Sequence, residues 1–423
     1  MDKETFINIL KVLFLKFSSF IFLYPLAIII SQELGAEGYG IYGFVTALSA
    51  MLAVFCTFGS DQMLVREIAK KEEKEDDKNL AIAVSSTTFL SFSVTLILTT
   101  FFCVLYLINE DVIWAYVASA IPIQVVRKLL VGIARGYGRV VSARFSEVIV
   151  QPAIALSLVF LLNLLDKLNL LYLIVAIIIS YVISSAYSAF KLRDKAHKLI
   201  TKFDKVDIKF WMFTATPFLG MAFSNTLIVY ADRVMLGILH SYTETGIYLV
   251  AARNASLLMV CFGCIQFVVG PKIAKLSQGS TIELQSMANL HVLLLIALGF
   301  VVMVPLFLLS DFLISLFGDE FSNSKDALFV LLISYFLMFL GGAPTQYLFM
   351  MGASKVALKI IVAAMVFNIT LNLILIPEYG AYGASIATGV SLMVKAVLGT
   401  IILFRKTGIH SSVFGCIWLK LRR

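Results

Sequence analysis

Twelve apolar segments, each long enough to cross a lipid bilayer as a helix, fill most of the sequence. Spanning the hydrocarbon core takes about 20 mostly apolar residues in a helix. Hydrophobic residues make up 60% of the 423 residues, and charged residues only 14%. The segments lie at 6–30, 39–60, 80–108, 111–133, 139–163, 170–191, 210–231, 244–269, 285–309, 325–350, 355–376 and 382–404. The sequence therefore predicts an all-α integral membrane protein with twelve crossings.

Lysine and arginine residues are distributed unevenly between the loops on the two sides of the predicted membrane. Seven of them fall within 191–209, and five each within 66–78 and 127–144, whereas the loops of the opposite side hold three altogether. Short loops rich in these residues stay in the cytoplasm, so both termini are predicted to be cytoplasmic. The net charge of +8 is mostly this topological bias, and we do not interpret it as nucleic-acid binding.

No motif in the sequence predicts an enzyme, a metal site or a cofactor. The five cysteines lie in apolar surroundings, and the pair Cys261 and Cys264 has no second pair or histidine to complete a metal site. No GxSxG, HExxH or P-loop pattern is present. The predicted outer loops are no longer than about 15 residues, which argues against a membrane glycosyltransferase or polymerase, because such an enzyme needs catalytic groups on sizeable loops.

An internal repeat indicates that one six-helix unit is used twice. Three short motifs recur in order, with offsets of 206, 204 and 205 residues. They are GIY at 40–42 and 246–248, FGSDQ at 58–62 and FGCIQ at 262–266, and IAK at 68–70 and 273–275. Because six is an even number, both copies enter the membrane in the same direction, as parallel repeats that enclose a central cavity.

The repeat and the charge pattern together predict the domain organisation. We predict an N-terminal six-helix lobe at 1–192, a cytoplasmic linker at 193–209, a C-terminal six-helix lobe at 210–404 and a cytoplasmic amphipathic tail at 405–423. The tail is expected to form a short helix on the membrane surface. Its apolar face would consist of Ile409, Val413, Phe414, Ile417, Trp418 and Leu421.

Three stretches of the sequence resemble a known family of transporters. They are LGAEGYGIYGF at 34–44, ADRVMLG at 231–237 and LNLILIPEYGAYGASIATGVS at 371–391. Together they resemble the polysaccharide flippases of the multidrug, oligosaccharidyl-lipid and polysaccharide exporter superfamily, particularly the O-antigen flippases, and the resemblance extends over almost the whole chain.

The resemblance implies a MATE-like fold, with a central cavity between two lobes that flippase members line with cations. It also implies a function, which is translocation of an undecaprenyl-diphosphate-linked oligosaccharide from the inner to the outer leaflet of the bacterial inner membrane by alternating access. Polysaccharide polymerase and chain-length machinery are then candidate partners. An ion-coupled multidrug antiporter of the same superfamily is the alternative, and the sign of the charges in the cavity distinguishes the two.

Three cations lie deep inside predicted spans, namely Lys16, Arg253 and Lys395. A charge at the bilayer centre costs about 2.5–3.5 kcal/mol on insertion scales, and such residues usually face a bundle interior or a water-filled cavity. No predicted span has an acid at comparable depth that would neutralise them. We therefore predict that they line the cavity and bind the diphosphate of the substrate, whereas Arg127, Lys128, Arg144 and Glu147 are expected to snorkel or to form local ion pairs.

Other polar residues and two prolines complete the predicted site. Asn225, Asn368 and Asn372 are candidates for a polar cavity lining, although hydrogen bonds between helices would explain them equally well. Pro25 and Pro217 each remove a backbone hydrogen bond inside a span. We predict that these two prolines are flex points for rocking of the lobes. The coupling ion, if there is one, is left open.

Overall fold

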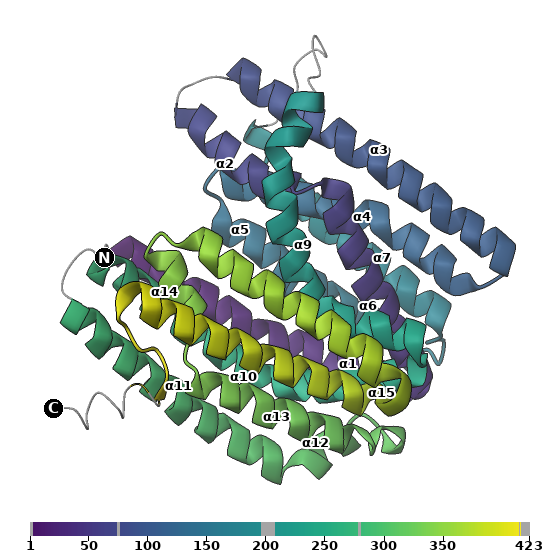
Figure 1. Cartoon of the computed structure of the whole chain (residues 1–423). Helices are drawn as coiled ribbons and strands as arrows, with labels where there is room; N and C mark the ends of the chain where they lie inside the picture. Colours follow the sequence, from purple (N-terminus) through teal and green to yellow (C-terminus); the bar gives the residue numbers. More distant parts are fainter. Residues whose placement is uncertain (1–2, 74–76, 196–207, 278–280, 414, 416–423) are drawn as a thin grey trace. The chain divides into compact units, whose positions relative to one another are not determined.

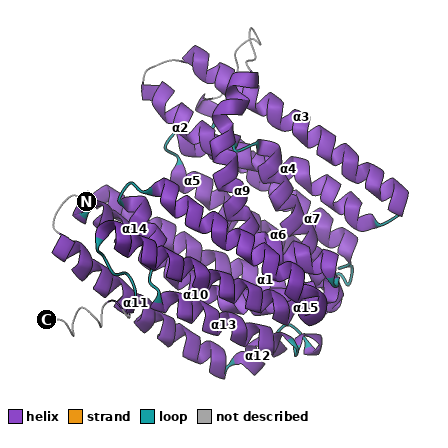
Figure 2. Cartoon of the chain, in the orientation of Figure 1, coloured by secondary structure: helices purple, strands orange, loops and turns teal. Residues whose placement is uncertain are grey.

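The described chain is helical, with no strand in the parts that the structure covers (Figure 1, Figure 2). The computed structural model describes residues 3–73, 77–195, 208–277, 281–413 and 415; at 3–17, 70–73, 77–79, 208, 217, 221 and 225 it describes the backbone alone. Helices are expected here because the bilayer offers no hydrogen bonds, so each spanning segment must satisfy its backbone groups internally.

Most of these helices are long and apolar enough to span a membrane. Eight qualify within the described residues, or ten if two sharply bent pairs are each counted as one span. Two of the eight are much longer than one crossing needs. Ser354–Thr407, with 54 residues, would measure about 80 Å, against a hydrocarbon core of about 30 Å. The prediction of an all-α membrane protein is confirmed, whereas twelve crossings in two six-helix repeats stay a prediction.

Each of the two longest helices is broken at a glycine. Helix α1 (Lys3–Thr57) is non-helical at Gly35, with φ 65°, and α15 (Ser354–Thr407) is non-helical at Gly380, with φ 51°. Side chains other than hydrogen are strained at these positive φ values. The break at Gly380 lies between the segments predicted at 355–376 and 382–404, after Pro377, which removes a backbone hydrogen bond from the helix.

The described chain packs as two units, and the first comprises residues 1–34 and 41–234. Helix α4 lies at its centre, where it packs against α2, α3 and α7. The unit thus includes residues 210–234, which the sequence assigns to the second predicted lobe; the predicted boundary at 193–209 stays a prediction. Its elements after α1 are α2 (Ser60–Glu73), α3 (Asp77–Asn109), α4 (Val112–Gly136), α5 (Val140–Phe145), the π-helix η1 (Ser146–Val150), α6 (Gln151–Leu164), α7 (Leu170–Lys191), η2 (Arg193–Lys195) and most of α9 (Ile208–Leu239).

The second unit comprises residues 35–40 and 235–423. Its core is formed where α10, α11, α13 and α15 pack against one another. Its elements are α10 (Tyr242–Leu276), α11 (Thr281–Leu308), α12 (Ser310–Ser315), η3 (Asp319–Phe321), α13 (Ser324–Leu340), α14 (Pro344–Met350) and α15.

Glutamate side chains cap both glycine breaks within this second unit. The backbone N–H of Ala36 donates to Glu320 Oε2 at 2.8 Å, and that of Ala381 donates to Glu244 Oε2 at 2.7 Å. Each N–H opens a new helical segment after the break, and such groups have no partner inside the helix. A carboxylate stabilises this position through both its hydrogen bond and the helix dipole.

The chain after α15 packs onto the second unit. Ile409 is 1% exposed and belongs to an apolar cluster that includes Val269, Leu284 and Leu403. The His410 N–H donates to Gln285 Oε1, and Gln285 Nε2 donates back to the His410 carbonyl, both at 2.8 Å. Ile409 is therefore buried in protein, and including it in a membrane-facing apolar stripe was wrong. The expected tail residues 414 and 416–423 lie outside the described residues.

Candidate functional site

The second unit contains a cavity of about 200 Å³ between α10, α15 and the junction of α13 with α14. Apolar side chains form most of its wall, and the polar groups come from three separate elements. The lining residues are Phe262, Gln266, Met338, Gly342, Ala343, Pro344, Thr345, Gln346, Phe349, Leu392, Lys395 and Ala396.

A broken helix forms one side of this cavity. Helices α13 and α14 are bent by 48° relative to each other. The break contains Gly342, with φ 72°, where a Cβ atom would lie 2.0 Å from the Ser411 carbonyl oxygen. Pro344 then starts α14, at a position where its missing N–H costs nothing. The break turns Thr345 and Gln346 onto the cavity wall.

Two of the polar side chains that line the cavity, Lys395 and Gln266, have no partner among the described residues. Lys395 is half-buried and has no hydrogen bond or ion pair with a described residue. Both amide atoms of Gln266, Nε2 and Oε1, are buried without a hydrogen-bond partner in the described structure. No aspartate or glutamate is among the lining residues. The cavity is therefore positively charged and offers both donors and acceptors.

The other two predicted cavity cations are placed differently. Arg253 lies on α10, half-buried, and its side chain makes no hydrogen bond or ion pair within the described residues. It does not line the cavity around Lys395, and it precedes Gln266 on α10 by 13 residues, or about 20 Å. Lys16 lies on α1, but its side chain is outside the described residues. Cavity lining by Arg253 and Lys16 stays a prediction.

Two of the three predicted asparagines bond to each other. Asn372 Nδ2 donates to Asn368 Oδ1 at 3.1 Å, and Asn368 Nδ2 donates to Thr388 Oγ1 at 3.5 Å. The first bond lies within the segment before the break at Gly380, and the second joins the parts of α15 on either side of it, which is what the alternative of helix packing expects. The side chain of Asn225, on α9, lies outside the described residues.

The two prolines expected to act as flex points both lie inside helices. Pro25 is exposed on α1, ten residues before the break at Gly35. Pro217 lies on α9, and its side chain is outside the described residues. Helix α9 bends by 48° between Phe218–Ser224 and Thr226–Leu239, after Pro217 and not at it. A role of either proline in rocking stays a prediction.

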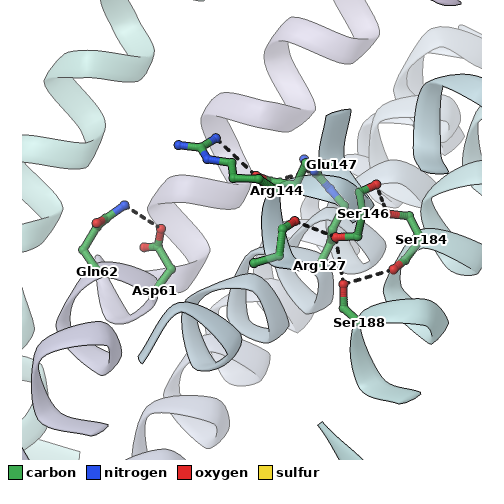
Figure 3. Close-up of polar contacts among 9 residues, drawn as sticks. Asp61, Gln62, Arg127, Arg144, Ser146, Glu147, Ser184 and Ser188 are labelled. Carbon is green, nitrogen blue, oxygen red and sulfur yellow. Dashed lines mark hydrogen bonds and ion pairs between the residues drawn. The ribbon is translucent and has the colours of Figure 1, made fainter. Parts of the chain in front are cut away.

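A second group of polar side chains lies in the first unit, on a π-helical turn (Figure 3). Glu147, within η1, pairs with Arg127 at 3.4 Å and with Arg144 at 3.3 Å. For these residues the expected local ion pair is confirmed. Two serines of α7 also bond to Ser146 of this turn. Ser184 Oγ donates to the Ser146 carbonyl at 2.8 Å, and Ser188 Oγ donates to Ser146 Oγ at 2.9 Å. The charges of this group are thus paired with one another, unlike the charge of Lys395.

The sequence reasoning missed Gln266 and Gln346. Both are neutral residues in apolar helices, so a search for charges passes over them. The repeat contains a signal, because FGCIQ ends on Gln266 and its counterpart FGSDQ ends on Gln62. In the first unit, Gln62 Nε2 donates to Asp61 Oδ2 at 3.4 Å.

No group of three or more potential metal ligands occurs among the described residues.

Solved transporter structures have a fold similar to that of this chain. An inward-facing multidrug resistance MATE family transporter of the MOP superfamily matches with a TM-score of 0.71 at 16% identity, over 92% of this chain and 94% of that chain. The lipid II flippase MurJ, in an inward closed conformation, matches with a TM-score of 0.70 at 14% identity, over 92% and 86%. The predicted MATE-like fold is thus confirmed.

Sequence comparison also relates the chain to transport proteins. A putative O-antigen transporter of Shigella flexneri is 24% identical over 396 residues, which cover 87% of this chain and 90% of that protein. A probable low-salt glycan biosynthesis flippase, Agl15 of Haloferax volcanii, is 22% identical over 374 residues, covering 87% and 77%. Both names are those of transporters and not of enzymes. The model of the family described as polysaccharide biosynthesis protein matches residues 2–277, more than half of the sequence, and the chain belongs to this family.

Proposed function

We propose that the chain is a flippase for a lipid-linked glycan, specifically an undecaprenyl-diphosphate-linked oligosaccharide of a surface polysaccharide. It moves this substrate from the inner to the outer leaflet by alternating access. Support comes from the family, from the relatives named as an O-antigen transporter and a glycan flippase, and from a fold shared with a lipid II flippase. Polysaccharide polymerase and chain-length machinery are proposed partners that act after translocation.

The observation that carries the proposal is that two cations in the second unit lack a partner of opposite charge among the described residues. Arg253 and Lys395 are half-buried and have no partner of opposite charge among the described residues. A buried charge is costly unless it is paired, so these residues suit a ligand that brings the negative charge. A diphosphate is such a ligand, because the arginine fork binds phosphate oxygens in pairs and lysine acts as a point charge.

A multidrug antiporter is the competing function, because transporters of that kind share the fold and fold alone does not decide function. Cationic drugs favour carboxylates in the binding cavity. The cavity around Lys395 has a cation and two amides and no acid among its lining residues. Its charge therefore favours an anionic substrate.

We further propose that the protein lies in the bacterial inner membrane with both termini in the cytoplasm. The distribution of lysine and arginine between the loops supports this orientation. In the proposed mechanism, two six-helix lobes joined by the linker at 193–209 rock about the flexible helices that contain Pro25 and Pro217. Lys16 and Arg253 contact the diphosphate, Lys395 contacts a negatively charged group of the same substrate in its own cavity, and Asn225, Asn368 and Asn372 contribute polar groups.

The proposal is tested by complementation in a strain that lacks its own flippase for a defined lipid-linked repeat unit. Expression of the wild-type chain should restore surface polysaccharide, and the membrane abundance of each variant should be measured alongside. Accumulation of the lipid-linked repeat unit at the inner leaflet, despite normal abundance of the protein, would contradict the proposed function for that glycan.

Variants of Arg253 test the anion site. Hydrogen bonds to charged groups contribute about 1.5–3 kcal/mol, so Arg253→Ala should weaken binding of the lipid diphosphate by about 10- to 150-fold. Arg253→Lys should recover part of the loss, because charge remains while the two-pronged contact is lost. Arg253→Glu should be worse than alanine through repulsion. Lys406→Glu, at the exposed end of α15, is the matched charge control and should export normally.

A further inference from the structure

The cavity around Lys395 presents hydrogen-bonding groups that described side chains do not satisfy. Its wall carries one ammonium group, two primary amides and one hydroxyl, from Lys395, Gln266, Gln346 and Thr345. We infer that this cavity binds a single sugar ring that carries a negatively charged group. The inference rests on the proposed function, because such a sugar would arrive as part of the lipid-linked glycan.

The unpaired amide of Gln266 favours a sugar over a bare diphosphate as the ligand. Its amide has a donor and an acceptor, and neither has a partner in the described structure. A diphosphate diester offers acceptors only, so it would leave Oε1 without a hydrogen bond. A sugar hydroxyl both donates and accepts, and neighbouring hydroxyls on one ring satisfy both amide atoms after a turn of the flexible glutamine side chain.

The unpaired ammonium group of Lys395 favours a sugar that carries a negatively charged group. Its side chain lines the same cavity and has no partner among the described residues, and no lining residue is acidic. An ammonium group that loses water on binding needs a charged acceptor to offset the cost. A carboxylate on the ring and a phosphate attached to the ring both meet this need.

The size and the walls of the cavity limit the ligand to one ring. A volume of about 200 Å³ is below the roughly 300–1,000 Å³ typical of sites for drug-sized ligands. The rings of Phe262 and Phe349 line it, and they offer apolar surfaces to the carbon face of a sugar. Phe262 is held in place by stacking on Phe339, with ring centroids 5.5 Å apart.

The fold also holds the second amide in position. A Cβ atom on Gly270 would lie 2.7 Å from Gln346 Nε2, so this glycine leaves the space in which the Gln346 amide lies. The break at Gly342 and the start of α14 at Pro344 place Gln346 beside Thr345. The broken helix thus fixes Thr345 and Gln346, while Gln266 and Lys395 are carried by the long helices α10 and α15.

Binding of small probes to the purified full-length protein in detergent tests the inference directly. Isothermal titration calorimetry would compare glucuronate, glucose 1-phosphate, glucose and inorganic phosphate. At least one of the two acidic sugars should bind more tightly than both glucose and phosphate. A preference for glucuronate assigns the negative group to a ring carboxylate, and a preference for glucose 1-phosphate assigns it to the phosphate on the first sugar. Equal binding of glucose and both acidic sugars, or tighter binding of phosphate alone, would overturn the inference.

Two substitutions show whether binding occurs in this cavity. Lys395→Met keeps an unbranched side chain of nearly the same length and removes its charge, so affinity for the acidic sugar should fall by about 10- to 150-fold to that of glucose. Gln266→Leu should weaken acidic and neutral sugars alike, by about tenfold. Lys406→Met, an exposed position on the same helix, is the matched control. Unchanged affinity in folded Lys395→Met would refute the site.

The outcomes separate this inference from the proposed function. Normal complementation by a chain that binds no acidic sugar would overturn the cavity site and leave the flippase function intact. Sugar binding that depends on Lys395, in a chain that never restores surface polysaccharide, would support the site and contradict the flippase function for that glycan.

Discussion

The close contact between the two GIY repeats predicts a large effect of one methyl group. Gly40 and Gly246, the first residues of the two motifs, lie against each other's helices within the second unit. A Cβ atom on Gly246 would lie 2.1 Å from the Ala36 carbonyl oxygen, and one on Gly40 would lie 1.7 Å from the Tyr242 carbonyl oxygen. Both obstructing atoms belong to the backbone, so no side chain can turn aside.

The size of the expected loss of stability follows from how closely the added Cβ atom would approach the backbone. Ordinary contact begins at about 3.4 Å, so Gly246→Ala requires the backbones to separate by roughly 1.3 Å, which is the difference between 3.4 Å and 2.1 Å. Overpacking of this kind typically costs about 1–3 kcal/mol. Separation at Ala36 would also strain the hydrogen bond from its N–H to Glu320.

Thermal unfolding of the purified protein in detergent measures this effect, with Gly220→Ala as the matched control. A Cβ atom on Gly220 would meet nothing within 4 Å, and alanine is the better helix former. Gly246→Ala should therefore unfold at a clearly lower temperature than wild type, and Gly220→Ala should not. Equal unfolding temperatures for the wild type and Gly246→Ala would refute the close contact.

Three further predictions follow from polar groups. Gln266→Leu should raise the free energy of unfolding by about 1–3 kcal/mol, because it removes a buried amide without partners; a loss of stability in unfolding titrations would contradict this. Glu320→Gln should lower it by about 1 kcal/mol, because the cap on the Ala36 N–H loses its charge, and an unchanged unfolding midpoint would argue against the cap. The hydrogen bond from Arg139 lowers the pKa of Asp194 to about 2, so this pair should persist as the pH falls to 4 and be lost only on approach to pH 2. Isotope-edited infrared titration should find the carboxyl pKa back near its usual value in Arg139→Gln, and an unshifted titration would contradict the pair.

Long apolar runs and glycine breaks made much of the fold predictable. Helix α7 occupies Leu170–Lys191, the range expected from its run of apolar residues, and the turn at Gly380 follows from the proline and glycines around it. The π-helical turn in Ser146–Val150 was not predictable, because SEVIV contains no glycine or proline. Ser184 and Ser188, which are distant in the sequence, donate hydrogen bonds to Ser146 in this turn.

The candidate site was only partly predictable. Lys395 stood out because a charge inside an apolar helix is costly, but the cavity that surrounds it depends on the broken helix at 341–344. The motif GGAP at that position contains both signals of a break, and the prediction of one span over 325–350 passed over them. Gln266 carries no charge, so a search for buried charges passes over it, and only the repeat of FGSDQ as FGCIQ marks it in the sequence.

Direct measurement of lipid flipping tests the central claim. The purified protein would be reconstituted into liposomes that contain an undecaprenyl-diphosphate-linked oligosaccharide, and transfer between leaflets would be followed by accessibility of the sugar to an added enzyme. Wild-type protein should speed transfer of the glycan lipid, Arg253→Glu should abolish this effect, and a cationic dye should not be transported. Transport of the dye without transfer of the glycan lipid, or full transfer by Arg253→Glu, would contradict the account of an anion-binding glycan flippase.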